Sequence, residues 1–301
     1  MSILVVGTVA FDSIETPSGS VDRELGGSAS YFAVAASFFA PVRVVGVVGE
    51  DFPREHIEFF EQRGIDLTGL QRKPGATFYW RGRYHEDVNI RDTLDLRLNV
   101  LSEFDPIVPQ PYRDADYVFL GNIDPQMQIQ VLAQLGGNRL RACDTMDHWI
   151  QNSRGNVERL LGSVETLVIN DSEARLLSGE RNIVRAARAI LKMGPKFLLI
   201  KRGEYGVLAF SDSSVFATPA YPLEEVFDPT GAGDSFAGGF LGQLARSGDH
   251  TERGLRRAII YGSVVASFTV EDFGLRRLKK LTGEEIEDRF RRFLALTDFH
   301  T

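Results

Sequence analysis

Residues 228–236 read DPTGAGDSF and lead directly into an apolar helical stretch. Gly231 and Gly233 allow the backbone to turn tightly and to aim successive N–H groups at an anion. The run AGDSFAGGFLGQLA predicts a helix that begins near Gly233, so its unpaired amides and positive dipole end face the same anion. Asp234 lies in the first turn, where a carboxylate is favoured, stays ionised and can take a proton from a substrate hydroxyl. A lone G-x-G-D more often marks a helix cap, but the full nine-residue string predicts a kinase.

Composition limits the class of protein further. The 301 residues, 43% of them hydrophobic, can bury the core of one large α/β domain spanning 1–301. The net charge of −7 and the pI near 5.4 argue against a nucleic-acid partner, because nucleic-acid binders carry a basic excess. Cys143 is the only cysteine, which suits a reducing compartment and a core position. The N-terminus lacks a signal-peptide pattern, and Pro41 and Arg43 interrupt the longest apolar stretch, so we expect a cytoplasmic protein with no membrane partner.

Short β-branched runs alternate with stretches of helical spacing along most of the chain. The expected strands are 3–7, 42–49, 116–121, 139–144, 166–170 and 196–201. Helices are expected at 28–39, 54–64, 126–137, 171–179 and 182–194, and the chain after Asp234 is predicted to be helical to its end. Because parallel strands need crossover connections and are covered on both faces, this alternation predicts a mainly parallel sheet between two layers of helices.

Two segments, approximately 11–24 and 76–100, interrupt this alternation. Both are rich in alternating polar and aromatic residues and poor in helix formers, which predicts exposed hairpin strands. They could form a substrate lid, an ordinary edge sheet or a dimer contact, and these roles are compatible. The second segment carries four large side chains in alternation: Trp80, Arg81, Arg83 and Tyr84. Two of the four are expected to point each way, so one pair could cover a substrate.

Two long motifs resemble those of a known family. DPTGAGDSFAGGF resembles the C-terminal signature of the ribokinase/PfkB family of ATP-dependent kinases, and LGGSASYFAVAASFF followed by VRVVGVVGEDFPREHIEFFEQRGID resembles its N-terminal signature. The motifs occur in family order over essentially the whole chain. The resemblance implies a ribokinase-like three-layer α/β/α sandwich with a mainly parallel central sheet and a small β-sheet lid. It also implies ATP and Mg²⁺ as cofactors.

The resemblance assigns roles within the C-terminal motif. Asp234 corresponds to the catalytic base, which agrees with the chemistry of the residues alone. The backbone of Gly231, Ala232 and Gly233, with the amide of Asp234, corresponds to an anion hole for the transferred phosphate. Two further positions match those that help hold an activating monovalent cation, such as K⁺, in related enzymes: Asp228 and Thr230. Local turn capping explains this pair equally well.

The nucleotide side is expected to draw on three segments. VINDSEARLLSG resembles the family's N-x-x-E motif, in which Asn170 and Glu173 would orient Mg²⁺ through water, although the same residues alone favour a helix cap. IKRGEYGVLAF resembles the hairpin along the ATP phosphates, with Gly203 and Gly206 allowing close approach. Lys201 replaces a small hydroxyl residue there and could touch a phosphate or extend into solvent. The adenine side is expected to include Ser263 and Val264.

The acceptor side matches the family less well. Asp12 matches the early substrate-binding aspartate, and Gly26 and Gly27 would let the backbone close on a sugar ring. Tyr31 stands where an asparagine is common, and an aromatic ring in the pocket casts doubt on a plain ribose- or fructose-like pose. Asp144 is retained in ACDTMDHWI, whereas the usual asparagine and arginine are replaced by Met146 and His148. His148 is therefore expected to be a polar loop residue.

These features favour phosphoryl transfer from Mg-ATP to a hydroxyl of a small sugar or polyol. A nucleoside kinase is the alternative, because Tyr31 and the aromatic residues of 76–100 could stack on a base. A non-catalytic sensor of the same fold is disfavoured by the intact Asp234 motif. The chain has neither a G-x-x-x-x-G-K-[ST] string nor a G-x-G-x-x-G after its first strand, which argues against a P-loop or dinucleotide enzyme. A homodimer through the two hairpin segments remains open.

Overall fold

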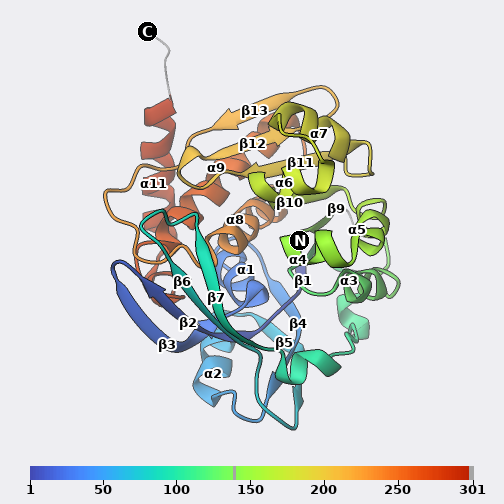
Figure 1. The fold of residues 1–301 in the computed structure, drawn as a ribbon, viewed down its shortest axis with the longest axis vertical. Coiled ribbons are helices and arrows are strands. Elements are labelled where there is room, and N and C mark those ends of the chain that lie inside the picture. Colours follow the sequence, from blue (N-terminus) through green and yellow to red (C-terminus); the bar gives the residue numbers. More distant parts are fainter. Residues whose placement is uncertain (138–139, 298–301) are drawn as a thin grey trace.

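A nine-stranded sheet forms the centre of the molecule, in a computed structural model that describes residues 1–137 and 140–297 (Figure 1). Its strands run in the order β13-β12-β11-β10-β9-β8-β1-β4-β5. The β11–β12 and β12–β13 pairs are antiparallel, and the other neighbours are parallel. The bounds are β1 Ile3–Val6, β4 Val42–Gly49, β5 Asp66–Lys73, β8 Tyr117–Leu120, β9 Leu140–Cys143, β10 Thr166–Asn170, β11 Phe197–Lys201, β12 Val207–Phe210 and β13 Val215–Thr218.

Helices cover both faces of this sheet. Ile3 and Val5 of β1 pack into one hydrophobic cluster and Leu4 and Val6 into another, which explains why the central strands are apolar at every position. The first cluster includes α1 (Ser28–Ala36), α2 (Arg54–Gln62), α8 (Ala232–Ser247), α9 (Glu252–Thr269), α10 (Arg276–Lys280) and α11 (Gly283–Thr297). The second includes α3 (Pro125–Leu132), α4 (Asp147–Asn152), α5 (Arg154–Leu161), α6 (Asp171–Ser178) and α7 (Ile183–Leu191). The predicted three-layer sandwich is confirmed.

A small sheet of four strands, β3-β2-β6-β7, lies beside the main sheet (Figure 1). Its strands are β2 (Ala10–Thr16), β3 (Gly19–Gly26), β6 (Tyr79–Tyr84) and β7 (Arg91–Arg97). The two hairpins, β2/β3 and β6/β7, join through a parallel β2–β6 pair. The segments expected to form hairpin strands therefore supply all four strands.

Each strand and helix expected in the core is present, with Arg139, the first residue of one expected strand, outside the described residues. Four elements lie outside the sequence expectations: β5, β13, α4 and α5. Strands β5 and β13 form the two edges of the main sheet and are half-exposed; β5 carries few consecutive apolar residues, and β13 is only four residues long. Three short 3₁₀ turns, at Asn99–Glu103, Gln110–Tyr112 and Gly203–Tyr205, complete the fold. Over the described residues, no helix has the length and apolar character of a membrane span.

Candidate active site

Three neighbouring strands end in polar residues at the same edge of the main sheet. Asp144 directly follows β9, Asn170 ends β10, and Lys201 ends β11. Asn170 and Lys201 are register partners, so their positions are adjacent. The carboxyl ends of parallel strands are where α/β proteins bind ligands, because the loops that follow them meet there.

Helix α8 starts at this edge and presents its amino end to it. Its N-cap, Gly231, has a left-handed backbone (φ 74°), and a Cβ there would lie 2.3 Å from the ring of Tyr31. The amide of Ala232 donates to Pro229 O at 3.2 Å. Within the described part of the chain, the amides of Gly233 and Asp234 have no backbone acceptor. The anion hole expected from the sequence is thus narrowed to two amides that can receive an anion.

Lys201 lies directly against this helix end. A Cβ on Gly233 would come within 2.5 Å of the Lys201 ammonium nitrogen. In the residues that the structure describes, Lys201 makes no hydrogen bond or ion pair, yet its charge lowers the pKa values of Asp144, Glu173 and Asp234. An ammonium placed among three carboxyl groups and beside two open amides is well placed to hold a phosphate.

The two aspartates beside Lys201 have perturbed pKa values. Burial raises the pKa of Asp234, while the positive charges of Lys201 and Arg91 hold it down. Burial also raises the pKa of Asp144, and repulsion by the charge of Asp234 raises it further. Both carboxyl groups therefore hold a proton more tightly than an exposed aspartate, and the charge of Arg91 favours the ionised form of Asp234.

Glu173 and Asn170 form a reciprocal helix cap at the start of α6. Asn170 Oδ1 accepts from the Glu173 amide at 2.8 Å, and Glu173 Oε2 accepts from the Asn170 amide at 2.8 Å. Burial raises the pKa of Glu173, opposed first by the charge of Lys201. One Glu173 oxygen is thus committed to the cap, and the other remains available to a water on a metal ion.

Asp228 and Thr230 are engaged in hydrogen bonds within their own loop and with β6. The Asp228 carboxylate accepts from the amides of Thr230 and Gly274, both at 2.8 Å, and is buried. The Thr230 hydroxyl donates to the Tyr84 hydroxyl at 3.2 Å. These contacts are the turn capping that the sequence allowed, and they link the loop before α8 to the small sheet.

Asp12 marks the acceptor end of the site. Its carboxylate lies against the backbone of Gly26, where a Cβ would come within 1.9 Å of Oδ2, so only glycine leaves room for it. Burial, followed by the charge of Asp228, raises the pKa of Asp12 to about 7, although a hydrogen bond from the Gly27 backbone opposes this shift. The charge of Asp234 also raises this pKa, which places the two carboxyl groups within electrostatic range of one another.

Several buried polar atoms at this end have no protein partner among the described residues. They are the hydroxyls of Ser30, Tyr31, Thr145, Ser235 and Ser263, together with Asp144 Oδ1. Buried polar groups are normally hydrogen-bonded, so those that adjoin the site residues, Asp144 Oδ1 and the hydroxyls of Thr145 and Ser235, are available to a polar ligand. Tyr31 itself is 1% exposed and packs on Gly231, so its ring supports the loop before α8.

Two residues expected to contact the nucleotide, Val264 and Gly206, instead pack against other parts of the protein. Val264 has no exposed surface and belongs to the core cluster that includes α8 and α9, so its expected position beside adenine is wrong. A Cβ on Gly206 would lie 2.0 Å from Thr218 O, so its close approach is to β13. The corresponding atom on Gly203 (φ 55°) would lie 2.3 Å from Asn89 Oδ1, which brings the loop of the β6/β7 hairpin against this turn.

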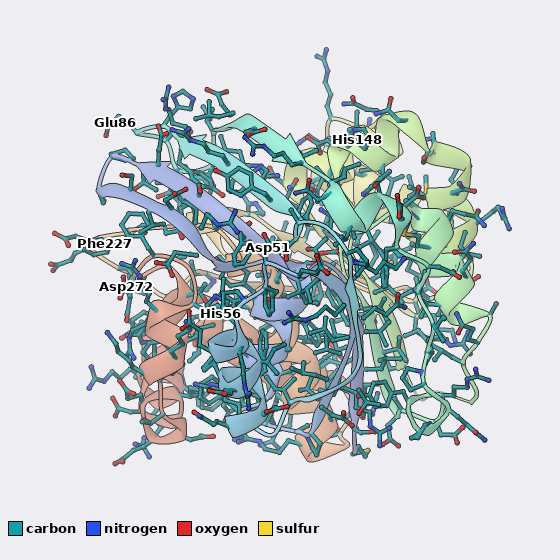
Figure 2. All side chains as sticks on the ribbon, turned by 90° about the horizontal axis from the view of Figure 1, so that it is seen from below. Asp51, His56, Glu86, His148, Phe227 and Asp272 are labelled. Carbon is teal, nitrogen blue, oxygen red and sulfur yellow. The ribbon has the colours of Figure 1, made fainter. Side chains whose placement is uncertain are left out.

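His148 and the side chains of β6 lie as the sequence pattern indicated. His148 is exposed near the start of α4 and packs edge-on against Trp149 at 4.7 Å, and Figure 2 shows it across the molecule from Glu86 in the β6/β7 loop. Trp80 and Tyr84 point to the face of the small sheet that also holds Ile14 and Phe273, hereafter the inner face. Arg81 and Arg83 instead pair with Glu15, at 2.6 and 2.8 Å.

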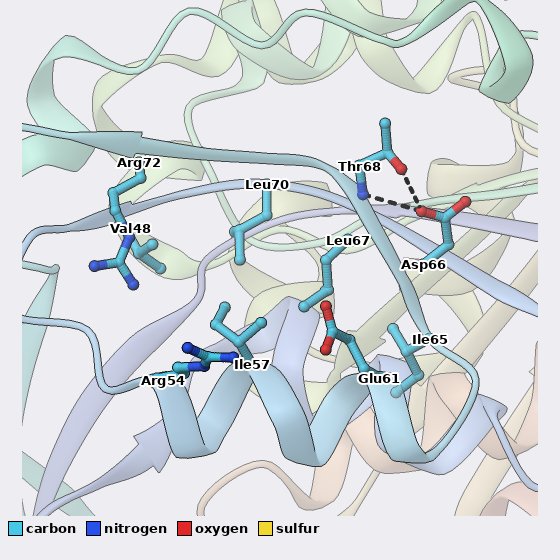
Figure 3. A pocket seen from close by; sticks show the side chains of 10 residues that line it. All are labelled: Val48, Arg54, Ile57, Glu61, Ile65, Asp66, Leu67, Thr68, Leu70 and Arg72. Carbon is cyan, nitrogen blue, oxygen red and sulfur yellow. Dashed lines mark hydrogen bonds between the residues drawn. The ribbon is translucent and has the colours of Figure 1, made fainter.

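A separate cavity of about 720 Å³ lies between α2 and β5 (Figure 3). Arg54, Ile57 and Glu61 of α2 line one side, and Leu67 and Leu70 of β5 the other. None of the residues described above lines it. It has no role in the chemistry of the Asp234 site.

The arrangement around Asp234 defines a class of protein. A carboxylate base, two open amides and an ammonium surround one position, and a second carboxyl group can hold the hydroxyls of an acceptor. These groups suit transfer of a phosphoryl group to an alcohol, in which positioning and charge stabilisation dominate. The class is an α/β kinase.

Comparison with known proteins agrees with this class. The model of the pfkB family of carbohydrate kinases matches residues 2–280. A cytidine kinase of Thermococcus kodakarensis is 33% identical over 252 residues, which cover 82% of this chain and 89% of the relative. The chain belongs to the pfkB family of carbohydrate kinases and is an ATP-dependent phosphotransferase.

Solved structures share the fold over nearly the whole chain. A nucleoside kinase of Burkholderia thailandensis in complex with inosine superposes with a TM-score of 0.80 at 22% identity, covering 97% of this chain and 99% of that one. A putative ribokinase II of E. coli in complex with ATP and Mg²⁺ gives 0.79 at 19% identity, with coverage of 97% and 99%. At these identities the likeness establishes the ribokinase-like fold.

Proposed function

We propose that this chain is a nucleoside kinase that transfers the γ-phosphoryl group of Mg-ATP to a ribose hydroxyl. The observation that carries the proposal is the acceptor end itself, where Asp12 lies within electrostatic range of Asp234 and beside the aromatic inner face of the small sheet. Asp12 would accept hydrogen bonds from ribose hydroxyls, and Trp80 offers a ring surface to a base. The cytidine kinase relative supports this choice of acceptor.

Asp234 is the general base of the proposed reaction. The acceptor hydroxyl loses its proton to the Asp234 carboxylate while its oxygen bonds to the γ-phosphorus, and the bond from that phosphorus to the departing ADP oxygen breaks. The amides of Gly233 and Asp234 hold the charge on the transferred group, and Lys201 neutralises it from the β11 side. The protonated form of Asp144, which its raised pKa favours, could donate a hydrogen bond to substrate.

ATP would lie along the β11–β12 turn, with Gly203 near its phosphates. Open amides, a free ammonium and a partly available carboxylate at Glu173 fit a triphosphate with Mg²⁺, because Mg²⁺ keeps most of its waters and needs few direct protein ligands. Asn170 positions Glu173 through the helix cap. A K⁺ ion near Asp228 and Thr230 completes the proposal, and a faster rate in K⁺ than in Na⁺ would support that ion.

The test is a panel of acceptors with ATP: pyrimidine and purine nucleosides, free ribose and fructose, and inositols. We expect kcat/KM for the best nucleoside to exceed that for any free sugar by at least about tenfold, because the base supplies binding that a sugar lacks. Product mass and ADP release would be measured, with Asp234→Asn as the inactive control. A free sugar or inositol as the best substrate would replace the nucleoside assignment with a carbohydrate kinase, and ligand binding without turnover would indicate a sensor.

We further propose that residues 1–301 act as one kinase domain in the cytoplasm, with the small sheet as its lid. Three leucines are exposed at the edge strand β7, with exposed fractions of 41–52%: Leu94 and Leu96 lie within the strand, and Leu98 lies just after it. Apolar side chains on an unpaired edge strand favour pairing with a second copy, so a homodimer through the lid is part of this proposal. Sedimentation of Leu96→Lys against the unmodified protein would test it.

A further inference from the structure

Arg91 is the first residue of β7 and lies directly opposite Tyr84, the last residue of β6. Residues opposite one another in an antiparallel pair point to the same face, so Arg91 shares the inner face of the lid with Tyr84. Its guanidinium carbon lies 5.7 Å from the centre of the Trp80 ring, and the guanidinium hydrogen-bonds the Tyr84 hydroxyl. Tyr84 is only 7% exposed and contacts Thr230, so this face of the hairpin meets the loop that leads into α8.

The other arginines of the hairpin are paired. Arg81 and Arg83 bind Glu15, and Arg97 binds Asp95 at 2.7 Å. Within the part of the chain that the structure describes, Arg91 has no carboxylate within ion-pair distance, although it remains exposed to an incoming ligand. Arg91 is therefore the arginine of this hairpin whose charge no neighbouring carboxylate satisfies.

The charge of Arg91 acts on both ends of the site. It lowers the pKa values of Asp12 at the acceptor end, Asp234 at the start of α8 and Glu173 at the start of α6. These carboxyl groups belong to three separate elements, so the guanidinium of Arg91 lies within electrostatic range of all three. Asn89, two residues earlier, contacts Gly203 on the nucleotide side, which supports the same placement.

The charge balance explains why a second cation is needed there. Five carboxyl groups lie in this region, each within electrostatic range of at least one other: Asp12, Asp144, Glu173, Asp228 and Asp234. Lys201 supplies positive charge from the floor of the site, at the end of β11. The opposite side lacks a cation from the β9–α4 loop, where Met146 and His148 stand, and His148 is turned to solvent. A phosphoryl group between these carboxylates would be repelled without a second positive charge.

We propose that Arg91 is a catalytic residue whose guanidinium binds the γ-phosphoryl group from the lid side, opposite Lys201. The inference rests on the proposed transfer from ATP. A guanidinium presents paired N–H donors that match two phosphate oxygens at once, and it stays charged at every relevant pH. Because Arg91 belongs to the lid, the full positive charge assembles around the phosphate only when the lid hairpin is in place.

The experiment compares Arg91→Gln with a matched control, Arg83→Gln, in the same hairpin but on the opposite face. Titration calorimetry with ATP and with ADP measures contact with the γ-phosphate without any acceptor. We expect Arg91→Gln to weaken the affinity for ATP by about tenfold, to change the affinity for ADP by no more than about twofold, and to lower kcat by about 10²–10³. Arg83→Gln should leave all three values within about twofold.

A purely structural role would produce a different pattern. Loss of lid packing would weaken ATP and ADP equally and lower the melting temperature, whereas a phosphate contact is partly restored by millimolar guanidinium in Arg91→Ala. An unchanged preference for ATP over ADP in Arg91→Gln would overturn the inference. If the unmodified protein binds ATP but phosphorylates no nucleoside, the substrate assignment fails and the ATP–ADP comparison still decides the role of Arg91. Failure to bind ATP at all would overturn both.

Discussion

The floor and the lid of the site differ in how their residues are placed. On the floor, the ends of β9, β10 and β11 and the start of α8 carry Asp144, Asn170, Lys201 and Asp234, and the backbone alone fixes their positions. On the lid, one hairpin holds arginines on both faces, and pairing between strands decides which of them reaches substrate. In the proposed mechanism, the floor therefore supplies the base and the phosphate-binding groups, while the balance of charge depends on the register of the lid.

The largest effect is expected on the floor, for Asp234→Asn. The amide cannot take the acceptor proton, so kcat should fall by about 10²–10⁴, and ATP affinity should stay nearly unchanged because the helix amides remain. Steady-state rates and ATP titration measure the two quantities. Retained activity, or equal losses of binding and rate, would contradict the role of Asp234 as base.

Two neighbouring glycines allow the floor's folding and chemical roles to be separated. Gly231→Ala places a side chain at φ 74° and against the buried Tyr31 ring, and should cost about 2–4 kcal/mol of unfolding free energy. Gly233→Ala meets only the mobile end of Lys201, so it should cost less than about 1 kcal/mol yet lower kcat about tenfold by displacing the ammonium. Denaturant unfolding and kcat would be measured for both variants. Equal changes of unfolding free energy and of kcat in the two variants would contradict the placement of the Lys201 ammonium beside Gly233.

The same difference explains what sequence could predict. The buried strands are apolar at every residue, and the Asp234 motif is contiguous, so the floor follows from local pattern. The position of Arg91 does not follow from local pattern. The register of the β6–β7 pair shifts between Arg81 and Gly82, so alternation along the sequence does not predict which face Arg91 occupies. The sequence places Lys201 at the end of a strand but does not reveal its role, because Gly233, which it contacts in the fold, is distant in the sequence. Val264 was assigned to the adenine side because its segment resembles the family's adenine helix, and that resemblance does not identify which face of α9 meets the core.

Helix α4 and strand β5 illustrate a second limit on prediction. Edge strand β5 reads DLTGLQRK, with a glycine and several polar residues, because one of its sides is open. Helix α4 is only six residues long, too short for a clear helical period. Neither element could be recognised from runs of consecutive apolar residues or from helical spacing, and neither supplies a residue to the site.

Asp12 links floor and lid through pH. Both of its oxygens are free to accept hydrogen bonds from hydroxyls only when it is ionised, and its pKa is raised to about 7. We therefore expect kcat/KM for the acceptor to rise about tenfold between pH 6 and pH 8, from the ionised fraction alone. The groups that act on it are Asp228 and Asp234, which raise this pKa, and Arg91 and the Gly27 backbone, which lower it.

The free energy of unfolding should fall with rising pH, whereas kcat/KM should rise. Because the folded protein binds the Asp12 proton more tightly than the unfolded chain, the fold loses stability as the pH rises from about 3.8, the ordinary pKa of an aspartate, to about 7, and the loss is complete above that pH. Asp12→Asn should therefore raise the melting temperature at pH 8 and have a smaller effect at pH 5. A melting temperature unaffected at both pH values would show that Asp12 titrates normally. The kinetic rise with pH should flatten in the same variant.

The smallest effect is expected at the contact between lid and floor, for Tyr84→Phe. This change removes the hydroxyl that accepts from Thr230 and meets Arg91, while the ring keeps its packing with Ile14 and Phe273. One hydrogen bond is worth about 0.5–1.5 kcal/mol, so kcat should fall by about two- to tenfold with little change in melting temperature. Tyr79→Phe is the matched control, because it loses a 2.9 Å bond to Ser13 within the same small sheet. Equal effects of the two changes would mean that the hydroxyl of Tyr84 supports only the small sheet, and that the lid does not hold Arg91 in place through it.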